Sequence, residues 1–422
     1  MLKRVLGRLL LVGGGIAFAL VAAEAVLGVG YWVAGGHRTT REDYHSAMLN
    51  LMAAPGGRQT NRRPGESPTG EPTVIHPYLG FVPAPSQPDG ATIGDLRQIP
   101  PRSDSELVVG VFGGSFASGV CNWAGQELRR VLSLPGKDVR LVCLAAGGYK
   151  QPQQLLALAY LLAQGAQLDL VLNIDGFNEV ALPPVDNAPQ GVAPIYPRGW
   201  FWEVGNLEDP GALKLLGELS VADRNRREWA AIFVRWGLYR STLLTLTWKS
   251  RDRLFEVERD RILTELRDHK IEQRNSYAAT GPAMTFADDQ SYYAYLARVW
   301  KDSSLQMRSL CEANGIAYDH FLQPNQYVEG SKPMTPGELR LIANPALYGR
   351  AVVLGYPHLR QEGEELGKAG VRFHDLTMVF KDVEDPLYKD GCCHLNADGY
   401  QRIARAIGES IRGGSVTSDS PN

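Results

Sequence analysis

A serine, a histidine and an aspartate stand where the chain could build a nucleophilic site. Ser115 follows Gly113-Gly114 at the end of an apolar run and opens a helical pattern. A serine on such a turn lies near the positive end of the helix, which suits a nucleophile. His394 lies just before another helical pattern, with Asp390 four residues upstream, and such a pair can act as general base and orienting acid. Singly, each residue also fits a simpler role as a helix cap or a surface side chain.

Two more turns could supply hydrogen-bond donors to that site. Ala145-Ala146-Gly147-Gly148-Tyr149 follows one apolar run, and Asp175-Gly176-Phe177-Asn178-Glu179 follows the next. Glycine lets backbone N–H groups approach a developing oxyanion, and an asparagine amide can add a further donor. Taken alone, each segment is equally compatible with an ordinary turn.

The apolar runs before these turns predict buried parallel strands, because they are short, rich in valine and alternate with helical patterns. The predicted strands are 107–112, 139–144, 168–174, 316–322 and 371–376, and the later helices are 292–313, 348–368 and 396–411. This order indicates a doubly wound α/β sheet, whose ligand crevice lies beyond the carboxyl ends of the strands. The candidate residues follow strand ends and are therefore predicted to meet.

In combination, the four blocks resemble the SGNH, or GDSL-like, hydrolase superfamily. Its members carry a serine after the first strand, a glycine after the second, Gly-x-Asn after the third, and Asp and His near the end. This chain has Ser115, Gly148, Gly176-x-Asn178 and Asp390…His394 in that order. The resemblance covers residues 107–182 and 371–412 closely and extends to the strand at Phe321-Leu322-Gln323-Pro324.

The resemblance implies a three-layer flavodoxin-like fold, ester chemistry and a role for each matching residue. Ser115 would attack the acyl carbonyl, His394 would take its proton and Asp390 would hold the imidazole. The oxyanion hole would consist of the Ser115 N–H, the Gly148 N–H (or that of the adjacent Gly147) and the Asn178 side chain.

The sequence departs from the family pattern in two places. Gly113-Gly114-Ser115-Phe116 stands where the family has Gly-Asp-Ser-Leu, so the aspartate is lost and the serine is kept. The family spaces its acid and histidine as Asp-x-x-His, whereas three residues separate Asp390 from His394 and the strict position is Gly391. Either Asp390 reaches the ring through a different turn, or a backbone carbonyl orients the ring instead.

No cofactor, metal or nucleic-acid partner is predicted. There is no Gly-x-Gly-x-x-Gly after the first strand and no P-loop, and a net charge of −2 gives no electrostatic case for nucleic acid. Five cysteines are too few for a disulfide scaffold. Cys392, Cys393 and His394 are metal-ligand types, but adjacent cysteines seldom reach one tetrahedral ion and no second cluster completes the set. Free thiols or a vicinal disulfide are expected instead.

The N-terminus predicts a membrane segment. Three cations, the last of them Arg8, precede an apolar run over residues 9–33 that only Glu24 interrupts. This charge pattern keeps the N-terminus cytoplasmic and sends the rest of the chain across the inner membrane. Residues 1–36 are therefore predicted as a basic end and a single-pass anchor, with a periplasmic catalytic domain. The alternative is a signal peptide cleaved near Ala23-Glu24-Ala25, which would release a secreted protein.

The remaining chain divides by composition. Residues 37–104 are predicted as a linker and extended lead-in, 105–412 as the catalytic domain with a helical insertion at about 200–275, and 413–422 as a disordered tail. Residues 224–253 carry a local charge of +6. They are interpreted either as a helix pair with a solvated basic face or as a surface for anionic lipid or polymer.

The leading hypothesis is an extracytoplasmic enzyme, a serine esterase or O-acyltransferase. It would act on acyl esters, mainly acetyl, of envelope or exported polysaccharide through an acyl-serine intermediate. A membrane acyl-donor protein is a candidate partner for transfer. The first alternative is a lipolytic esterase at the membrane surface. The second is a non-catalytic assembly or binding protein. The sequence leaves the substrate, the acyl chain and the choice between hydrolysis and transfer open.

Overall fold

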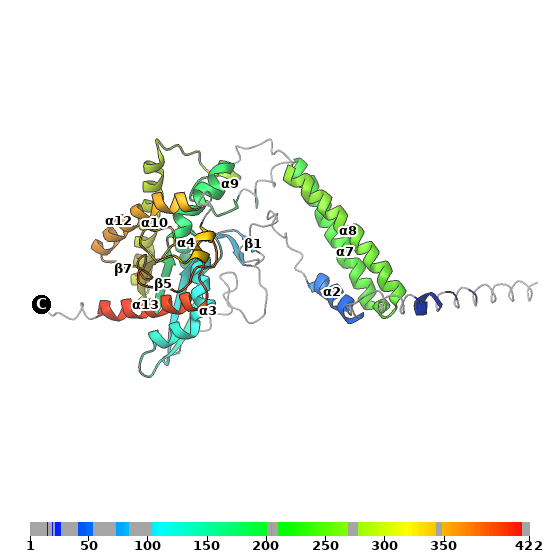
Figure 1. The fold of residues 1–422 in the computed structure, drawn as a ribbon, viewed down its shortest axis with the longest axis horizontal. Coiled ribbons are helices and arrows are strands. Elements are labelled where there is room, and N and C mark those ends of the chain that lie inside the picture. Colours follow the sequence, from blue (N-terminus) through cyan, green and yellow to red (C-terminus); the bar gives the residue numbers. More distant parts are fainter. Residues whose placement is uncertain are drawn as a thin grey trace, which may run out of the picture. The chain divides into compact units, whose positions relative to one another are not determined.

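The computed structural model describes residues 15, 19, 22–26, 41–53, 73–83, 103–200, 204, 210–268, 277–342 and 348–415. The chain forms two compact units (Figure 1). Unit 1 comprises Met1–Arg58 and Leu207–Glu272, and unit 2 comprises Gln59–Asn206 and Gln273–Asn422. Most of the predicted anchor, linker and tail lie outside the described residues, and the first three residues of the predicted tail belong to a helix that ends at Ser415. No helix among the described residues combines the length and the apolar character that crossing a membrane requires.

Unit 2 is built on a five-stranded sheet in which every neighbouring pair is parallel. Its strands are β3 (Glu106–Gly113), β4 (Asp138–Cys143), β5 (Leu170–Asp175), β6 (Ala317–Leu322) and β7 (Arg372–Asp375). Their spatial order is β4-β3-β5-β6-β7, which is the flavodoxin-like order of a doubly wound sheet. The predicted α/β fold class is therefore confirmed. The order reverses at β3, so a ligand crevice is expected beyond the carboxyl ends of β3 and β5.

Helices cover both faces of this sheet (Figure 1). Helix α3 (Ser115–Leu132) packs against α13 (Ala397–Ser415). Helix α10 (Asp289–Ala313) packs against α4 (Gln153–Ala163), α5 (Phe177–Leu182) and α12 (Gly349–Lys368). Right-handed crossovers on either side of β3 place these two groups on opposite faces, which gives three layers.

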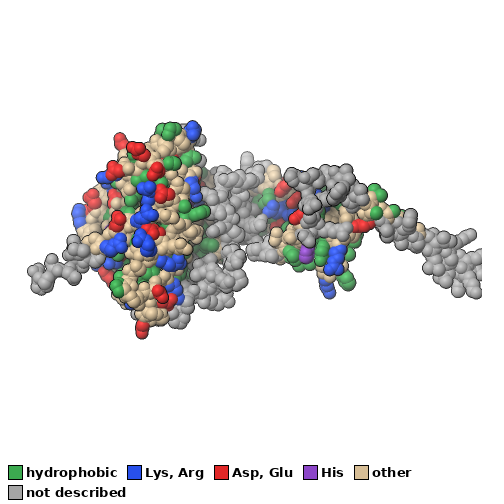
Figure 2. Space-filling view, turned by 60° about the horizontal axis from the view of Figure 1, so that its bottom comes forward, with side chains coloured by type: hydrophobic (Ala, Val, Ile, Leu, Met, Phe, Trp, Pro, Cys, Tyr) green, Lys and Arg blue, Asp and Glu red, His purple; other side chains and the backbone are tan. Residues whose placement is uncertain are grey.

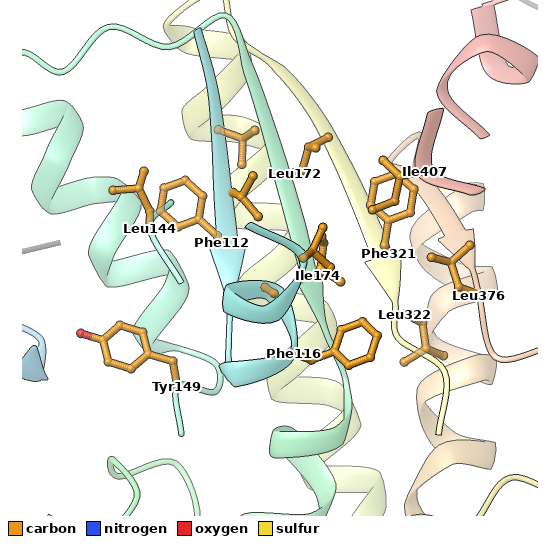
Figure 3. Close-up of a cluster of buried hydrophobic side chains, with 14 of the residues drawn as sticks. Phe112, Phe116, Leu144, Tyr149, Leu172, Ile174, Phe321, Leu322, Leu376 and Ile407 are labelled. Atoms are coloured by element: carbon orange, nitrogen blue, oxygen red, sulfur yellow. The ribbon is translucent and has the colours of Figure 1, made fainter. Parts of the chain in front are cut away.

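The two covered faces explain why the strands are almost uniformly apolar. All six residues of β5 are buried, as are the last six of β3. Side chains such as Phe112, Leu172, Ile174 and Phe321 form one contiguous core (Figure 3). A strand buried on both faces needs apolar side chains in both directions, and this produced the continuous runs in the sequence.

Shorter elements complete unit 2. They are β1 (Thr73–His76), β2 (Gly80–Pro83), the single helical turns η2 (Pro183–Asn187) and η3 (Ala188–Gln190), α9 (Tyr277–Thr280) and α11 (Pro336–Leu341). Strands β1 and β2 form an antiparallel hairpin. The Tyr149 hydroxyl donates to the Phe81 carbonyl (2.5 Å), which ties this hairpin to the turn after β4.

A disulfide that the sequence analysis did not predict joins Cys121 on α3 to Cys143 at the end of β4. Its Cα atoms are 6.1 Å apart, which is within the usual range for a disulfide. In the view of Figure 2, Lys and Arg side chains are interspersed with Asp and Glu on the face of unit 2. That face therefore presents no surface of a single charge.

Unit 1 is a helical assembly of α2 (Arg41–Ala53), α7 (Pro210–Arg235) and α8 (Thr242–Asp268), with the turn η5 (Leu238–Arg240) between the last two. Helices α7 and α8 occupy the segment predicted as a helical insertion, whereas α2 lies in the segment predicted as a linker. Helix α2 packs on α7 around a small apolar cluster that includes Met48, Phe233 and Trp248.

Ionic contacts join the two long helices of unit 1. Arg226 on α7 bonds both carboxylate oxygens of Asp252 on α8, at 2.5 and 2.9 Å, and also contacts Glu256. Part of the positive charge over residues 224–253 is thereby neutralised by ion pairs between α7 and α8. At the start of α8, the Glu24 carboxylate accepts hydrogen bonds from the Ser241 hydroxyl (2.7 Å) and from the backbone N–H groups of Thr242 and Leu243.

Candidate active site

Ser115 is the first residue of α3, directly after the end of β3. Gly114 occupies the N-cap position with extended backbone angles, so the chain turns sharply from strand to helix there. The N–H groups of the first helical turn lack intrahelical acceptors and carry the positive end of the helix dipole. The Ser115 side chain is thus held at the edge of the sheet where the crevice is expected.

The structure brings the three predicted catalytic side chains into one hydrogen-bonded row. His394 Nε2 lies 2.8 Å from Ser115 Oγ, and His394 Nδ1 lies 2.6 Å from Asp390 Oδ2. With its proton on Nδ1 donated to the carboxylate, the ring presents an unprotonated Nε2 to the serine hydroxyl. Burial of Asp390 favours its neutral form, but the hydrogen bond and charge of His394 outweigh it and lower the pKa of this carboxyl.

The irregular spacing of acid and histidine is accommodated by a turn around Asp390. Its second oxygen, Oδ1, accepts the backbone N–H groups of Cys392 (2.9 Å), Cys393 (3.2 Å) and His394 (3.3 Å). These bonds fold the three intervening residues around the carboxylate and leave Oδ2 directed at the ring. Of the two possibilities that the sequence left open, the structure has the side chain of Asp390 on the ring.

Three residues that sequence reasoning missed hold this turn from outside. The Asn325 amide donates to the Cys392 carbonyl (3.0 Å), the Gln326 amide to the Asp390 carbonyl (3.0 Å), and the Tyr327 hydroxyl to the Gly391 carbonyl (2.8 Å). All three follow β6 at its carboxyl end. The rule that strand ends line the crevice, applied to this strand as well, was the signal that could have found them.

The predicted oxyanion donors gather beside Ser115. Asn178 Nδ2 donates to the Tyr149 carbonyl (2.7 Å) and lies 2.2 Å from the position that a Cβ on Gly114 would take. An amide nitrogen carries two hydrogens, so one remains for a ligand. Within the described residues, neither the Gly147 nor the Gly148 N–H has a hydrogen-bond acceptor. The two glycines therefore stay alternatives for the third donor.

The close approach of Asn178 to Gly114 leads to a prediction. Any side chain at this position would collide with Asn178 Nδ2 and approach the Tyr149 carbonyl to 3.2 Å. We expect Gly114→Ala to displace the Asn178 amide and to lower kcat. The loss should not exceed the ~10²- to 10³-fold decrease that is typical of removing an oxyanion donor. Steady-state ester hydrolysis measures the change. Asn178→Ala in the wild-type and Gly114→Ala backgrounds is the control, because the two losses should not add if both act on the same donor.

Glu179 is a buried carboxyl that the sequence analysis also missed. It joins the turns after β4 and β5, which carry the candidate oxyanion donors. Its Oε2 accepts the Gly176 N–H (2.8 Å), while Oε1 accepts the Gln151 N–H (3.0 Å) and the Gln154 side-chain amide (3.3 Å). Burial, assisted by the nearby Asp175, raises the pKa of Glu179 to about 8. This single side chain fixes the turn after β4 relative to the turn after β5.

Glu179→Ala is expected to destabilise the protein, because it leaves those buried donors without an acceptor. At about 1–3 kcal/mol for each unsatisfied group, the free energy of unfolding should fall by roughly 3 kcal/mol or more, measured by urea denaturation. The contribution of Glu179 to the stability of the wild type is complete below pH 4.5, the ordinary pKa of a glutamate, and is lost as pH rises through its raised pKa of about 8. The difference in free energy of unfolding between the wild type and Glu179→Ala should therefore become smaller as pH rises. Glu409→Ala, at an exposed position of α13, is the control, and an equal loss there would contradict the prediction.

A second histidine–aspartate pair lies deeper in unit 2. His320 Nε2 is 2.8 Å from Asp175 Oδ1, which also accepts from Trp300 Nε1 (2.6 Å). Neither His320 nor Asp175 has appreciable solvent contact. The pair lies in the core below the crevice, where no substrate can reach it, and we interpret it as structural.

The residues around His394 do not make a convincing metal site. Cys392, Cys393 and His394 offer ligand atoms within 4.8 Å of one another, and the two sulfurs are 3.3 Å apart. Both thiols are free. Either ring nitrogen of His394 would have to give up its contact with Ser115 or Asp390 to bind a metal ion. Binding of a metal ion to these three residues would therefore compete with the hydrogen bonds that join Asp390, His394 and Ser115.

The solved structures to which this chain is similar include two from Bacteroides species. One is a candidate acylhydrolase from Bacteroides fragilis and the other a GDSL-like lipase from Bacteroides thetaiotaomicron, each 11% identical to this chain. Both alignments cover 76% of this chain, together with 93% and 94% of the other, at TM-scores of 0.37 and 0.36. No protein-family model and no curated protein matches the chain.

Proposed function

We propose that this protein is an extracytoplasmic serine esterase or O-acyltransferase. Its substrates are acyl esters, acetyl esters in particular, of envelope or exported polysaccharide. The observation that carries the proposal is the row of hydrogen bonds from Asp390 Oδ2 through His394 to Ser115 Oγ, placed at the strand-to-helix turn.

The geometry supports a two-step acyl transfer. Ser115 Oγ attacks the ester carbonyl while His394 Nε2 takes the hydroxyl proton, and Asp390 stabilises the resulting imidazolium. The Ser115 N–H, the Asn178 amide and a glycine N–H at 147–148 stabilise the oxyanion. His394 then gives its proton to the leaving alcohol, which leaves an acyl-serine. Water or an acceptor hydroxyl, deprotonated by His394, attacks this intermediate and restores the free serine.

Two features support an extracytoplasmic location with a retained N-terminal segment. The Cys121–Cys143 disulfide suits an oxidising compartment. Glu24, which lies in the candidate cleavage sequence, satisfies donors at the start of α8, so cleavage after Ala25 would remove this cap. Intact mass of the protein isolated from membranes tests retention, and a species beginning after Ala25 would contradict it.

Turnover by the full chain in detergent tests the enzymatic proposal. We expect hydrolysis of p-nitrophenyl acetate and a single fluorophosphonate adduct on Ser115, read by intact mass and peptide mapping. A folded protein with neither turnover nor adduct would contradict it and favour a binding or assembly role. The polysaccharide substrate is tested separately by acyl analysis of envelope glycans in a deletion strain, where an unchanged ester content would contradict that part.

One observation in unit 1 favours a lipolytic esterase as the second candidate. Trp236, after α7, is 70% exposed, and the Arg235 guanidinium lies 5.8 Å from the centre of its ring. An exposed tryptophan beside a cation suits a membrane interface. Anionic vesicles should then raise ester hydrolysis by the wild type and not by Trp236→Ala. An equal response from both proteins would remove the support.

A further inference from the structure

Arg198 lies against one of the glycine turns of the site. A Cβ added to Gly148 would lie 2.9 Å from Arg198 Cδ and 3.5 Å from its Cβ, so the methylene stem of the arginine covers this glycine. Gly148 also has a φ of +81°, which side-chain-bearing residues rarely adopt. The backbone and the missing side chain thus let the arginine approach the turn that carries a candidate oxyanion donor.

One edge of the guanidinium is fixed by a carboxylate. Arg198 Nε donates to Asp186 Oδ2 at 2.6 Å, and the two side chains are 25% and 23% exposed. Burial opposes the positive charge, but Asp186 outweighs it and raises the pKa of the guanidinium above its ordinary value. Within the described residues, Nε is the only nitrogen of this group with a hydrogen-bond partner. Its two terminal amino groups are therefore available to a ligand.

The loop that carries Arg198 is held by buried donors. Lys150, 1% exposed and two residues beyond Gly148, donates to the carbonyls of Pro194 (2.7 Å) and Tyr196. The Asn187 amide also donates to the Tyr196 carbonyl, at 2.9 Å. A binding group held in place before the ligand arrives loses less conformational entropy on binding. This fixation is expected of a recognition residue and is unnecessary for a solvated surface arginine.

The charge of Arg198 also reaches the His394 side of the site. Burial raises the pKa of Tyr348 to about 12, and the positive charge of Arg198 acts against that rise. Cys392, in the turn around Asp390, is likewise close enough to interact electrostatically with Arg198. The guanidinium therefore lies near both the Gly148 turn and the turn that precedes His394.

We propose that Arg198 binds an anionic group of the ester substrate, a carboxylate in particular, and thereby directs the site to acidic esters. The inference rests on the proposed function. A guanidinium with two free amino groups matches the two oxygens of a carboxylate, and such charge-assisted pairs are strong and directional. The anionic group can belong to the acyl or to the alcohol part of the ester.

Paired esters test the proposal on the full chain. On the acyl side, p-nitrophenyl hemisuccinate is compared with p-nitrophenyl acetate, and on the alcohol side O-acetyl galacturonic acid is compared with its methyl ester. The readout is the ratio of kcat/KM for the charged and neutral member of each pair. Arg198→Met keeps the methylene stem over Gly148 without the charge, and Arg198→Lys keeps the charge without the paired amino groups of the guanidinium. Arg129→Met, at an exposed position, is the matched control.

The wild type should prefer the charged member of at least one pair. In Arg198→Met that ratio should fall about 10- to 100-fold, as expected for losing a hydrogen bond to a charged group, and Arg198→Lys should keep part of it. Arg129→Met should keep the wild-type ratio. The pair that responds identifies the side of the ester. A wild type with no charge preference, or an unchanged ratio in Arg198→Met, overturns the proposal while the esterase function stands.

A binding measurement separates this proposal from the proposed function. If the protein hydrolyses none of the four esters, the enzymatic proposal fails, and thermal unfolding with free galacturonate still tests Arg198. Galacturonate should raise Tm of the wild type more than its methyl ester does, and this difference should vanish in Arg198→Met. The same comparison of monomethyl succinate with dimethyl succinate probes the acyl part, and equal effects within both pairs on the wild type would overturn the assignment of Arg198.

Discussion

Ser115→Ala is expected to reduce ester turnover by about 10⁴- to 10⁶-fold, the range for removing a nucleophile from a serine–histidine–aspartate unit. In the proposed mechanism Ser115 Oγ bonds the carbonyl carbon, and His394 Nε2, which lies 2.8 Å from it, receives its proton. Alanine leaves the oxyanion donors and the substrate contacts in place. The residual rate should therefore still exceed hydrolysis in water.

The measurement is single-turnover and steady-state hydrolysis of p-nitrophenyl acetate, with fluorophosphonate labelling of the same preparations. Ser118→Ala, one turn further along α3, is the matched control and should retain both turnover and label. Circular dichroism and Tm of Ser115→Ala should match the wild type, since the change removes one partly exposed hydroxyl. Activity above a tenth of the wild-type value would assign the reaction to another nucleophile.

The strands of the sheet were predictable because each one corresponds to a short continuous apolar run in the sequence. The runs at 107–112 and 139–144 differ by one residue at each end from β3 and β4. A strand covered by helices on both faces has no polar side, so composition alone locates it. The strand–helix rhythm indicated a doubly wound sheet, and its flavodoxin-like arrangement was implied by the family resemblance.

The contacts that shape the site were less accessible, because they join residues far apart in the chain. Gln326 supports the Asp390 carbonyl from 64 residues away, and Glu179 joins the turn at Gly176 to Gln151. A single sequence gives no signal for such pairs beyond the rule that strand ends converge. Arg198 was missed for the same reason, since only the fold brings it to Gly148. The motif residues differ in that a known order of blocks links them.

The Cys121–Cys143 disulfide is another contact that the sequence alone could not predict. Cys121 and Cys143 lie 22 residues apart, with an odd total of five cysteines in the chain. Spacing could not single out this pair, because proximity depends on how α3 returns to β4 across the sheet. Composition excluded a disulfide scaffold, and one isolated bond does not conflict with that.

Asp390→Asn is expected to lower kcat by about 10⁴-fold with little change in structure, by enforcing the wrong tautomer of His394. The backbone N–H groups of Cys392, Cys393 and His394 all point at Oδ1. Asparagine must therefore keep its carbonyl oxygen at that position and place its amide at Oδ2. The amide donates to His394 Nδ1, which forces the ring proton onto Nε2, where it faces Ser115. The ring can then no longer accept the serine proton.

Asp390→Ala separates this orienting role from the structural one. Alanine removes the acceptor for three backbone donors as well, so it should lower Tm in addition to kcat, whereas Asp390→Asn should lower kcat alone. Asp398→Asn, at an exposed position in the first turn of α13, is the control for loss of a carboxylate nearby. Thermal unfolding and p-nitrophenyl acetate kinetics on all three variants test the pair. A loss below tenfold in Asp390→Asn would mean that a backbone carbonyl, and not this carboxylate, orients the ring.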